Sequence, residues 1–190
     1  DKRLGRLVMQ EAGVPVPLTM DVDEFYRWNG PDNKQWIARP ARHAQGRNLV
    51  CGNYNSILPF LRTTLYRTGY VSELINKVAE YRVFVVQNRV AWVAQKTPGN
   101  PQNVAWNVAQ GGRFDNVRWS DWNTKVLDAA LKAAKLSGTD FCGVDVMVDA
   151  EGNPYVLEVN SAPSQTSPYR QQCVAKAFHY IFSTGSKTPF

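Results

Sequence analysis

The segment 141–163, FCGVDVMVDAEGNPYVLEVNSAP, constrains the fold more than any other stretch of the chain. Apolar and polar residues alternate on both sides of residues 151–154, and this alternation predicts two β-strands. Glu-Gly-Asn-Pro between them is typical of a turn, because Gly152 permits a positive φ and Pro154 is disfavoured inside a sheet. The sequence therefore predicts two adjacent strands joined by a tight turn.

Polar side chains on this hairpin are candidates for a metal site. Alternation places Glu158 and Asn160 on one face of the second strand, and Asp145 joins them if the hairpin pairs about its turn. Two carboxylates and an amide oxygen are hard ligands that suit Mg²⁺, especially where substrate phosphates complete the coordination. An ordinary hairpin with a solvated polar face has the same pattern, so the hairpin alone leaves both interpretations open.

The remaining sequence mixes short strands with helices. Helical periodicity predicts helices at 2–12, 21–28, 53–66, 120–137 and 171–182, and extended segments at 35–39, 49–50, 69–75, 81–87 and 90–96. A Gly-, Pro- and Asn-rich loop is expected at 97–112. This order favours an α+β chain with antiparallel sheets over a doubly wound parallel fold. Neither a GxxxxGK[ST] phosphate loop nor a GxGxxG dinucleotide fingerprint occurs.

Composition narrows the classes of partner. The 190 residues carry a net charge of +6, which favours a polyanionic partner such as nucleotide phosphates. A nucleic-acid partner stays open, but no Lys/Arg run favours it. No apolar run approaches the ~20 residues of a membrane span. The three cysteines are widely spaced and odd in number, which favours free thiols in the reducing cytoplasm over a disulfide framework or a zinc site.

A set of short motifs occurs in a defined order along nearly the whole chain: Asp1-Lys2, Gly13-Val14-Pro15-Val16-Pro17, Trp36-Ile37-Ala38-Arg39-Pro40 followed by Gly46, Ser72-Glu73-Leu74-Ile75, Glu80-Tyr81-Arg82, Gly143-Val144-Asp145 and Glu158-Val159-Asn160-Ser161-Ala162-Pro163. In this order the chain resembles the ATP-grasp superfamily of carboxylate–amine ligases. It is most similar to the ribosomal-protein glutamate ligases and to D-alanine–D-alanine ligase, and the last motif is the most specific.

The resemblance implies an ATP-grasp fold, in which two α+β lobes with antiparallel sheets grip ATP between them. Residues 1–190 form a single ATP-grasp domain on this interpretation. The small lobe covers residues 14–72, and residues 1–13 with 73–190 form the C-terminal lobe. The N-terminal domain that usually precedes this region is absent or is not in the chain, which begins without an initiator Met.

Site residues also follow from the resemblance. It implies an ATP-binding set of Lys2, Arg39, Gly46, Glu73, Leu74, Ile75, Glu80 and Asn107. Glu80 would contact the ribose hydroxyls, and an ion pair with Lys77 or Arg82 is the alternative for it. Asp145, Glu158 and Asn160 match the ligands of Mg²⁺, with Mn²⁺ as an alternative ion. Arg39, Arg82 and Asn160 are the candidate catalytic residues, although Arg39 stands where a lysine is usual and a structural ion pair is an equal alternative for Arg82. Guanidinium is also a good phosphate donor, so this departure is mild.

Three functional hypotheses follow. The first is an ATP-dependent, ADP-forming ligase that joins a small carboxylate donor to an amine acceptor, such as an amino acid or peptide, through an acyl phosphate. The second is a nucleotide-binding ATP-grasp member with kinase-like activity or no ligase activity, and the third is a basic nucleic-acid-binding module. The first needs no protein nucleophile, which agrees with the lack of a Ser/His/Asp arrangement. No membrane partner is expected, and the sequence does not define an oligomeric state.

Overall fold

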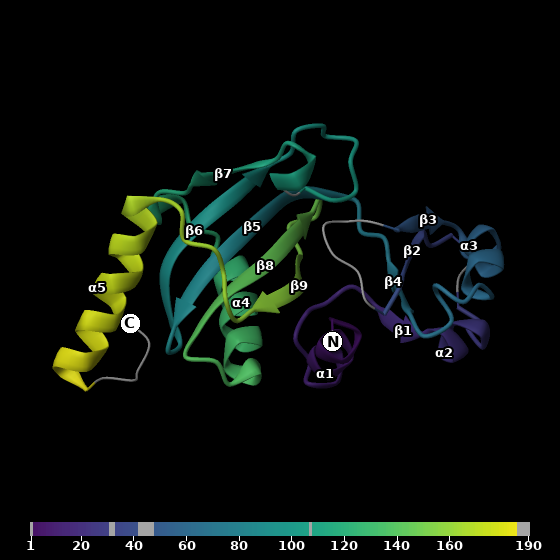
Figure 1. Cartoon of the computed structure of the whole chain (residues 1–190), viewed down its shortest axis with the longest axis horizontal. Coiled ribbons are helices and arrows are strands. Elements are labelled where there is room, and N and C mark those ends of the chain that lie inside the picture. The colour runs from purple at the N-terminus through teal and green to yellow at the C-terminus, as the bar shows by residue number, and fades with distance from the viewer. Residues whose placement is uncertain (1, 31–32, 42–47, 107, 186–190) are drawn as a thin grey trace. The chain divides into compact units, whose positions relative to one another are not determined.

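The computed structural model describes residues 2–30, 33–41, 48–106 and 108–185, and the chain divides into two compact units, Asp1–Asn76 and Lys77–Phe190 (Figure 1). The fold is α+β with two antiparallel sheets, as the sequence predicts. The lobe boundaries at residues 13/14 and 72/73 stay a prediction, because compactness alone does not define ATP-grasp lobes.

The first unit is a four-stranded sheet with three helices. Its elements are α1 (Lys2–Glu11), β1 (Thr19–Asp21), α2 (Val22–Tyr26), β2 (Trp36–Arg39), β3 (Val50–Gly52), α3 (Tyr54–Leu61) and β4 (Tyr70–Glu73). The strand order is β1-β4-β2-β3. Trp36 on β2 is fully buried and meets Phe25 of α2 edge to face at 5.1 Å, so an aromatic core holds these elements together.

The second unit is built on a five-stranded sheet in the order β7-β6-β5-β8-β9. Its elements are β5 (Lys77–Val86), β6 (Arg89–Thr97), the 3₁₀ turn η1 (Val108–Gln110), β7 (Arg113–Asn116), the 3₁₀ turn η2 (Trp119–Asp121), α4 (Thr124–Ser137), β8 (Phe141–Asp149), β9 (Pro154–Asn160) and α5 (Pro168–Thr184). Of these, β7 was not predicted, and neither was β1 in the first unit; the expected helix at 120–137 begins at Thr124 instead.

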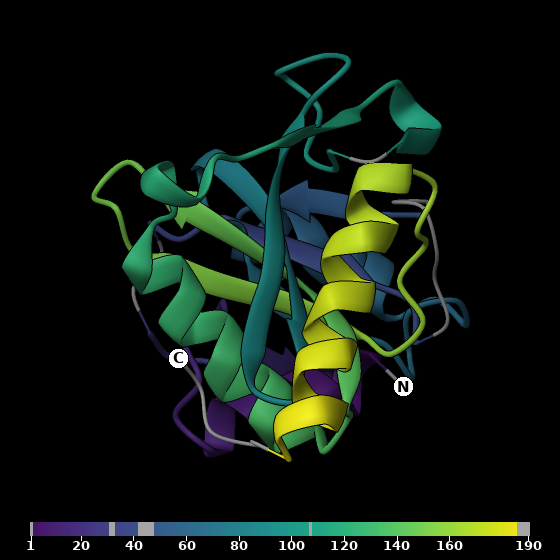
Figure 2. The same ribbon diagram turned by 90° about the vertical axis from the view of Figure 1, so that its left-hand side faces the viewer.

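Two helices cover this sheet (Figure 2). Helix α4 packs along β5, β8 and β9, and it begins where the Asn123 side chain accepts hydrogen bonds from the N–H groups of Lys125 and Val126 at 3.0 and 3.3 Å. Helix α5 packs on β5 and β6 and buries Val174 and Ile181. Both helices end at a glycine with a positive φ, which is the residue commonly found at a left-handed C-cap.

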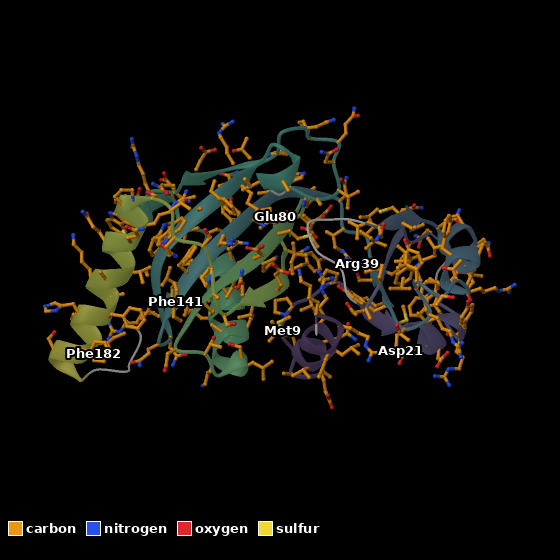
Figure 3. All side chains as sticks on the ribbon, viewed as in Figure 1. Met9, Asp21, Arg39, Glu80, Phe141 and Phe182 are labelled. Atoms are coloured by element: carbon orange, nitrogen blue, oxygen red, sulfur yellow. The ribbon has the colours of Figure 1, made fainter. Side chains whose placement is uncertain are left out.

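The face of the sheet beneath α5 changes character along the strands. The rings of Phe84 on β5 and Trp92 on β6 stack under α5 with their centroids 4.3 Å apart, and they form the apolar end of this face. Glu80, by contrast, lies further along β5 and is buried among cations. Figure 3 labels Glu80 towards one end of the sheet and Phe141, which pairs with Val86, towards the other. One sheet thus offers an apolar surface for a helix and a polar surface next to it.

No helix in the described residues is long and apolar enough to cross a membrane.

Candidate active site

A row of charged residues runs across three neighbouring strands of the second sheet. The strand register pairs Arg82 of β5 with Asp145 of β8, and Asp145 with Glu158 of β9. Asn160 pairs with Gly143, one step further along the same face. Asp145 and Glu158 therefore share one face, as predicted, because directly opposed residues point the same way. A β-bulge between Asp145 and Val146 produces this register, since regular pairing from the turn would set Asp145 opposite Leu157.

Asp145 accepts hydrogen bonds from two cations. Arg82 donates to both of its oxygens, from Nε to Oδ1 at 2.6 Å and from Nη2 to Oδ2 at 2.8 Å. Lys96 of β6 donates from Nζ to Oδ2 at 2.7 Å. Burial disfavours the charged form of Asp145, but Lys96 and Arg82 outweigh it and hold its pKa below the ordinary value. Asp145 is consequently an ionised carboxylate inside the protein.

Glu80 forms the second half of the same network. It is almost fully buried and forms ion pairs with Lys77 through Oε2 and with Lys96 through Oε1. Lys96 therefore joins Glu80 to Asp145, and both carboxylates raise its pKa against the opposing effect of burial. The pairing of Glu80 with Lys77 was one of the sequence alternatives, and its assignment to the ribose hydroxyls stays a prediction.

The donor set on this face fits a hard divalent cation. A carboxylate has about four acceptor positions, and Arg82 and Lys96 use three of those on Asp145, which leaves one on Oδ1. Glu158 lies opposite, and the Oδ1 of Asn160 accepts the Ala162 N–H at 3.0 Å and keeps a second lone pair. No group of three His, Cys, Asp or Glu side chains able to hold a metal occurs among the described residues. Two carboxylates and an amide are therefore the oxygen ligands available here.

Close packing around Gly143 explains why a glycine stands two positions before Asp145. A Cβ at Gly143 would lie 2.9 Å from Cβ of Pro163 and 3.4 Å from Cδ of Arg82. A side chain would therefore push against both the segment that follows Asn160 and the arginine that holds Asp145. The two hairpin motifs seen in the sequence thus meet in space.

The first unit places a second cationic group around Arg39. Arg39 at the end of β2 donates to the Ser72 hydroxyl on β4, and the buried Arg6 of α1 donates to the same oxygen at 3.3 Å. Both guanidinium groups lie over the Tyr70 ring, at 5.7 and 5.8 Å. Burial, with the nearby Arg6 charge, lowers the pKa of Arg39 to about 9. An anion bound at Arg39 would relieve this repulsion.

The other predicted ATP-binding residues have varied surroundings. Lys2 is exposed on α1. Glu73 forms an ion pair with Lys34, and the Leu74 N–H donates to the Gln35 carbonyl at 2.8 Å, so this N–H is already used. Ile75 is half-buried in the segment after β4. Gly46 and Asn107 lie outside the described residues.

Sequence reasoning missed several residues of the charged network. Lys96 was not singled out, although a lysine in the alternating strand 90–96 is a usable signal of a paired charge. Phe114 was also missed: the charged groups of Arg82, Lys96 and Arg170 lie 4.9, 5.6 and 5.8 Å from its ring centroid. No pattern near Phe114 marks it, because β7 itself was not predicted.

The two antiparallel sheets with their helices form the fold of solved ATP-grasp ligases. D-alanine–D-alanine ligase from Bacillus anthracis aligns with a TM-score of 0.64 at 18% identity, over 95% of this chain and 63% of that one. The ATP-grasp ligase PsnB, in complex with a phosphomimetic variant of its minimal precursor, Mg and ADP, aligns with a TM-score of 0.61 at 22% identity, over 93% of this chain and 58% of that one.

The family is more specific than the fold. Residues 48–180 match the RimK-like ATP-grasp domain, and the chain belongs to this family. A probable alpha-L-glutamate ligase from Halorhodospira halophila is 36% identical over 175 residues, 86% of this chain and 55% of that protein. Tetrahydromethanopterin:alpha-L-glutamate ligase from Methanocaldococcus jannaschii is 36% identical over 103 residues, 52% of this chain and 33% of that protein. The chain thus spans between a third and somewhat over half the length of these two relatives.

Proposed function

We propose that this chain carries the ATP-binding and catalytic part of an ATP-dependent, ADP-forming carboxylate–amine ligase, which makes an amide through an acyl phosphate. The observation that carries the proposal is the in-register Asp145–Glu158 pair within a RimK-like ATP-grasp domain. Relatives named alpha-L-glutamate ligases support an amide-forming reaction. The reactants proposed are ATP, a small carboxylate donor and an amine acceptor that is an amino acid or peptide, and the compartment proposed is the cytoplasm.

Asp145, Glu158 and Asn160 are the proposed ligands of Mg²⁺, with Mn²⁺ as an alternative. A bound ion of this kind neutralises phosphate oxygens and so lets an anionic carboxylate approach. The role of Arg82 is to orient Asp145 through two hydrogen bonds. Together with Lys96 it keeps that carboxylate ionised, so that binding a cation displaces no proton.

Nucleotide contacts are proposed for both units. In the first unit, the predicted set comprises Arg39 and Lys2 for phosphates, Gly46 in the loop after β2, and Glu73, Leu74 and Ile75 for the adenine. Because the Leu74 N–H already donates to Gln35, adenine recognition would use other backbone groups of this segment. In the second unit, Glu80 is the ribose candidate and Asn107 a phosphate-side or substrate-side candidate. Arg39, Arg82 and Asn160 are the proposed catalytic residues.

Thermal unfolding with and without MgATP tests nucleotide binding. MgATP is expected to raise the melting temperature, since a ligand at 100 times its Kd stabilises the native state by about 2.7 kcal/mol. Glu158→Ala should remove the Mg²⁺-dependent part of this shift. Glu151→Ala is the matched control, because Glu151 is an exposed carboxylate in the turn of the same hairpin. An equal loss in both variants would contradict the assignment of Glu158.

ADP release in the presence of amino acids and short peptides separates the ligase from its alternatives. A ligase should form ADP only when a carboxylate donor is present, and it should sustain ADP release over many turnovers only when an amine is present as well. ADP release that needs neither, or phosphate transfer to another acceptor, would favour the kinase-like alternative. A shift in melting temperature with DNA but none with MgATP would favour a nucleic-acid-binding module and refute the ligase.

A further inference from the structure

Arg170, in the first turn of α5, is fixed beside the charged network by four contacts. Its guanidinium lies 4.5 Å from the ring centroid of Trp92 and 5.8 Å from that of Phe114. Its Nε donates to Oδ1 of Asn116 at 3.1 Å, and its Nη2 donates to the Phe114 carbonyl at 2.8 Å. Two ring contacts and two hydrogen bonds restrict both the position and the plane of the guanidinium, so it is pre-organised.

The acceptors of Arg170 do not neutralise it. The amide of Asn116 and the carbonyl of Phe114 are both uncharged, and within the part of the chain that the structure describes no carboxylate forms an ion pair with Arg170. Its Nη1 group donates to no described acceptor. Burial lowers the pKa of Arg170, Asp115 opposes this effect, and the nearby charge of Arg82 lowers the pKa further. Arg170 is therefore a half-buried cation with N–H donors left for an anion.

Phe114 connects Arg170 to the Asp145 row. Arg82 and Lys96, which hold Asp145, both contact the ring that Arg170 contacts. In the strand register, Asn116 pairs with Ala94 and Ala94 with Arg82, so the hydrogen-bond partner of Arg170 lies in the same cross-strand row as Asp145. An anion on Arg170 would therefore lie on the same face of the sheet as the proposed metal ligands.

A second polar group without a partner lies at the same end of α5. Both side-chain amide atoms of Gln165 are buried and have no hydrogen-bond partner among the described residues. The backbone carbonyl of Gln165 accepts a hydrogen bond from Nε2 of Gln171 at 2.8 Å, which places Gln165 against the first turn of α5, the turn that also carries Arg170. A buried amide without partners is unusual in a folded protein and indicates a bound ligand or water.

We propose that Arg170 is a specificity-determining residue, which binds a non-reacting carboxylate of the substrate with the help of Gln165. This inference rests on the proposed ligase function and names a feature of its substrate: the substrate carries a carboxylate besides any group that reacts. Two N–H donors of one guanidinium can bind the two oxygens of such a carboxylate side by side. A neutral amide or a hydroxyl in the same place on the ligand could not form this pair of charge-assisted hydrogen bonds. A substrate with an amide in that place leaves the Arg170 charge unpaired and is rejected.

Arg170 also attaches α5 to the sheet, so its structural role must be separated from recognition. Arg89 offers a matched control: its guanidinium lies 4.5 Å from the Tyr180 ring centroid, so it stacks between β6 and α5 as Arg170 does. Tyr180 is ten residues beyond Arg170, about 15 Å along the helix axis. Arg89→Gln should loosen the contact between helix and sheet without touching the proposed carboxylate site.

The experiment measures the thermal shift caused by L-glutamate and by L-glutamine on the chain saturated with MgADP. The unsubstituted chain is expected to bind L-glutamate at least tenfold more tightly than L-glutamine, because a charge-assisted hydrogen bond contributes about 1.5–3 kcal/mol, or about 10- to 100-fold. Arg170→Gln should abolish this preference and keep the MgADP shift. Arg170→Lys should keep a reduced preference, since it retains the charge without the paired donors. Arg89→Gln should keep the full preference.

Each outcome separates the two proposals. A glutamate preference that is lost in Arg170→Gln and kept in Arg89→Gln supports the assignment. No preference in the unsubstituted chain, or an equal preference in Arg170→Gln, overturns it while leaving nucleotide binding intact. If Arg170→Gln does not fold, an undiminished preference in Arg170→Lys overturns the assignment instead. Failure of MgADP and MgATP to shift the unsubstituted chain would refute the proposed function itself.

Discussion

Replacing Lys96 with methionine tests whether the charged network is a coupled unit. Lys96 forms ion pairs with Glu80 and with Asp145, and all three side chains are at most 8% exposed. Met keeps most of the length and the apolar stem but removes the charge. Both carboxylates would then stay buried, each with one cation, Lys77 or Arg82.

The magnitude follows from this arrangement. Removing one partner of a buried ion pair costs about 3–5 kcal/mol, because the other partner is left without its compensating charge. Here each carboxylate keeps a second cation, so we expect the lower end of that range, about 3 kcal/mol. Urea denaturation at neutral pH measures the free energy of unfolding with the precision needed. Lys132→Met on the exposed surface of α4 is the control and should change it by less than about 0.5 kcal/mol.

A second substitution makes the test sharper. Glu80→Gln in the Lys96→Met background removes one of the two carboxylates and should restore part of the lost stability. The double-mutant cycle should therefore give a coupling energy of about 0.5–3 kcal/mol. The reasoning is refuted if Lys96→Met costs no more than Lys132→Met, or if the effects of the Lys96 and Glu80 substitutions simply add.

Three further predictions concern glycines and a turn. Gly143→Ala should destabilise the protein by about 1–3 kcal/mol, because the added methyl group overpacks against Pro163. Gly5→Ala in α1 should stabilise it by up to about 1 kcal/mol, because a Cβ there meets nothing within 4 Å and alanine favours the helix. Urea denaturation measures the free energy of unfolding of both variants. Burial opposes the charged form of Asp149, but hydrogen bonds, chiefly from Asn153, hold its pKa below the ordinary value. Its contribution to stability is therefore present above the ordinary Asp pKa of about 3.9 and is lost as pH falls through the lower folded value. Asp149→Asn should cost stability at neutral pH and approach the unsubstituted chain in acid; a pH-independent difference would contradict this.

The sequence predicted the two strands of the hairpin and the turn between them because these patterns are local. Regular pairing from the turn, with Val148 opposite Pro154 and Val146 opposite Val156, would set Asp145 opposite Leu157. A β-bulge between Asp145 and Val146 shifts the register and sets Asp145 opposite Glu158 instead, and the alternating pattern does not predict this bulge. The mixed order of strands and helices predicted antiparallel sheets, but this local reasoning missed β1 and β7. It could not supply the partners of Asp145, because Arg82 and Lys96 are 63 and 49 residues away in sequence. Only the pairing of β5 with β6 and β8 brings them together.

Arg170 illustrates a second kind of limit. Its neighbours come from β6 and β7, and β7 follows a loop with no clear strand pattern. A helix prediction for 171–182 left Arg170 just outside the helix, whereas α5 begins at Pro168 and includes it. Helix ends are set by capping and packing as much as by periodicity, so a boundary error of a few residues hid Arg170, which shares the Phe114 ring with Arg82 and Lys96.

The cations around Asp145 give the site a property that the hairpin alone would lack. A carboxylate that is only 4% exposed would ordinarily take up a proton, because burial disfavours its charge. Arg82 from β5 and Lys96 from β6 reverse this preference, so Asp145 is ionised before any ligand arrives. The hairpin supplies the carboxylate, whereas neighbouring strands supply its charge state. A substitution on β5 or β6 should therefore weaken Mg²⁺ binding at β8 and β9 without changing any proposed metal ligand, and Lys96→Met provides that test alongside its effect on stability.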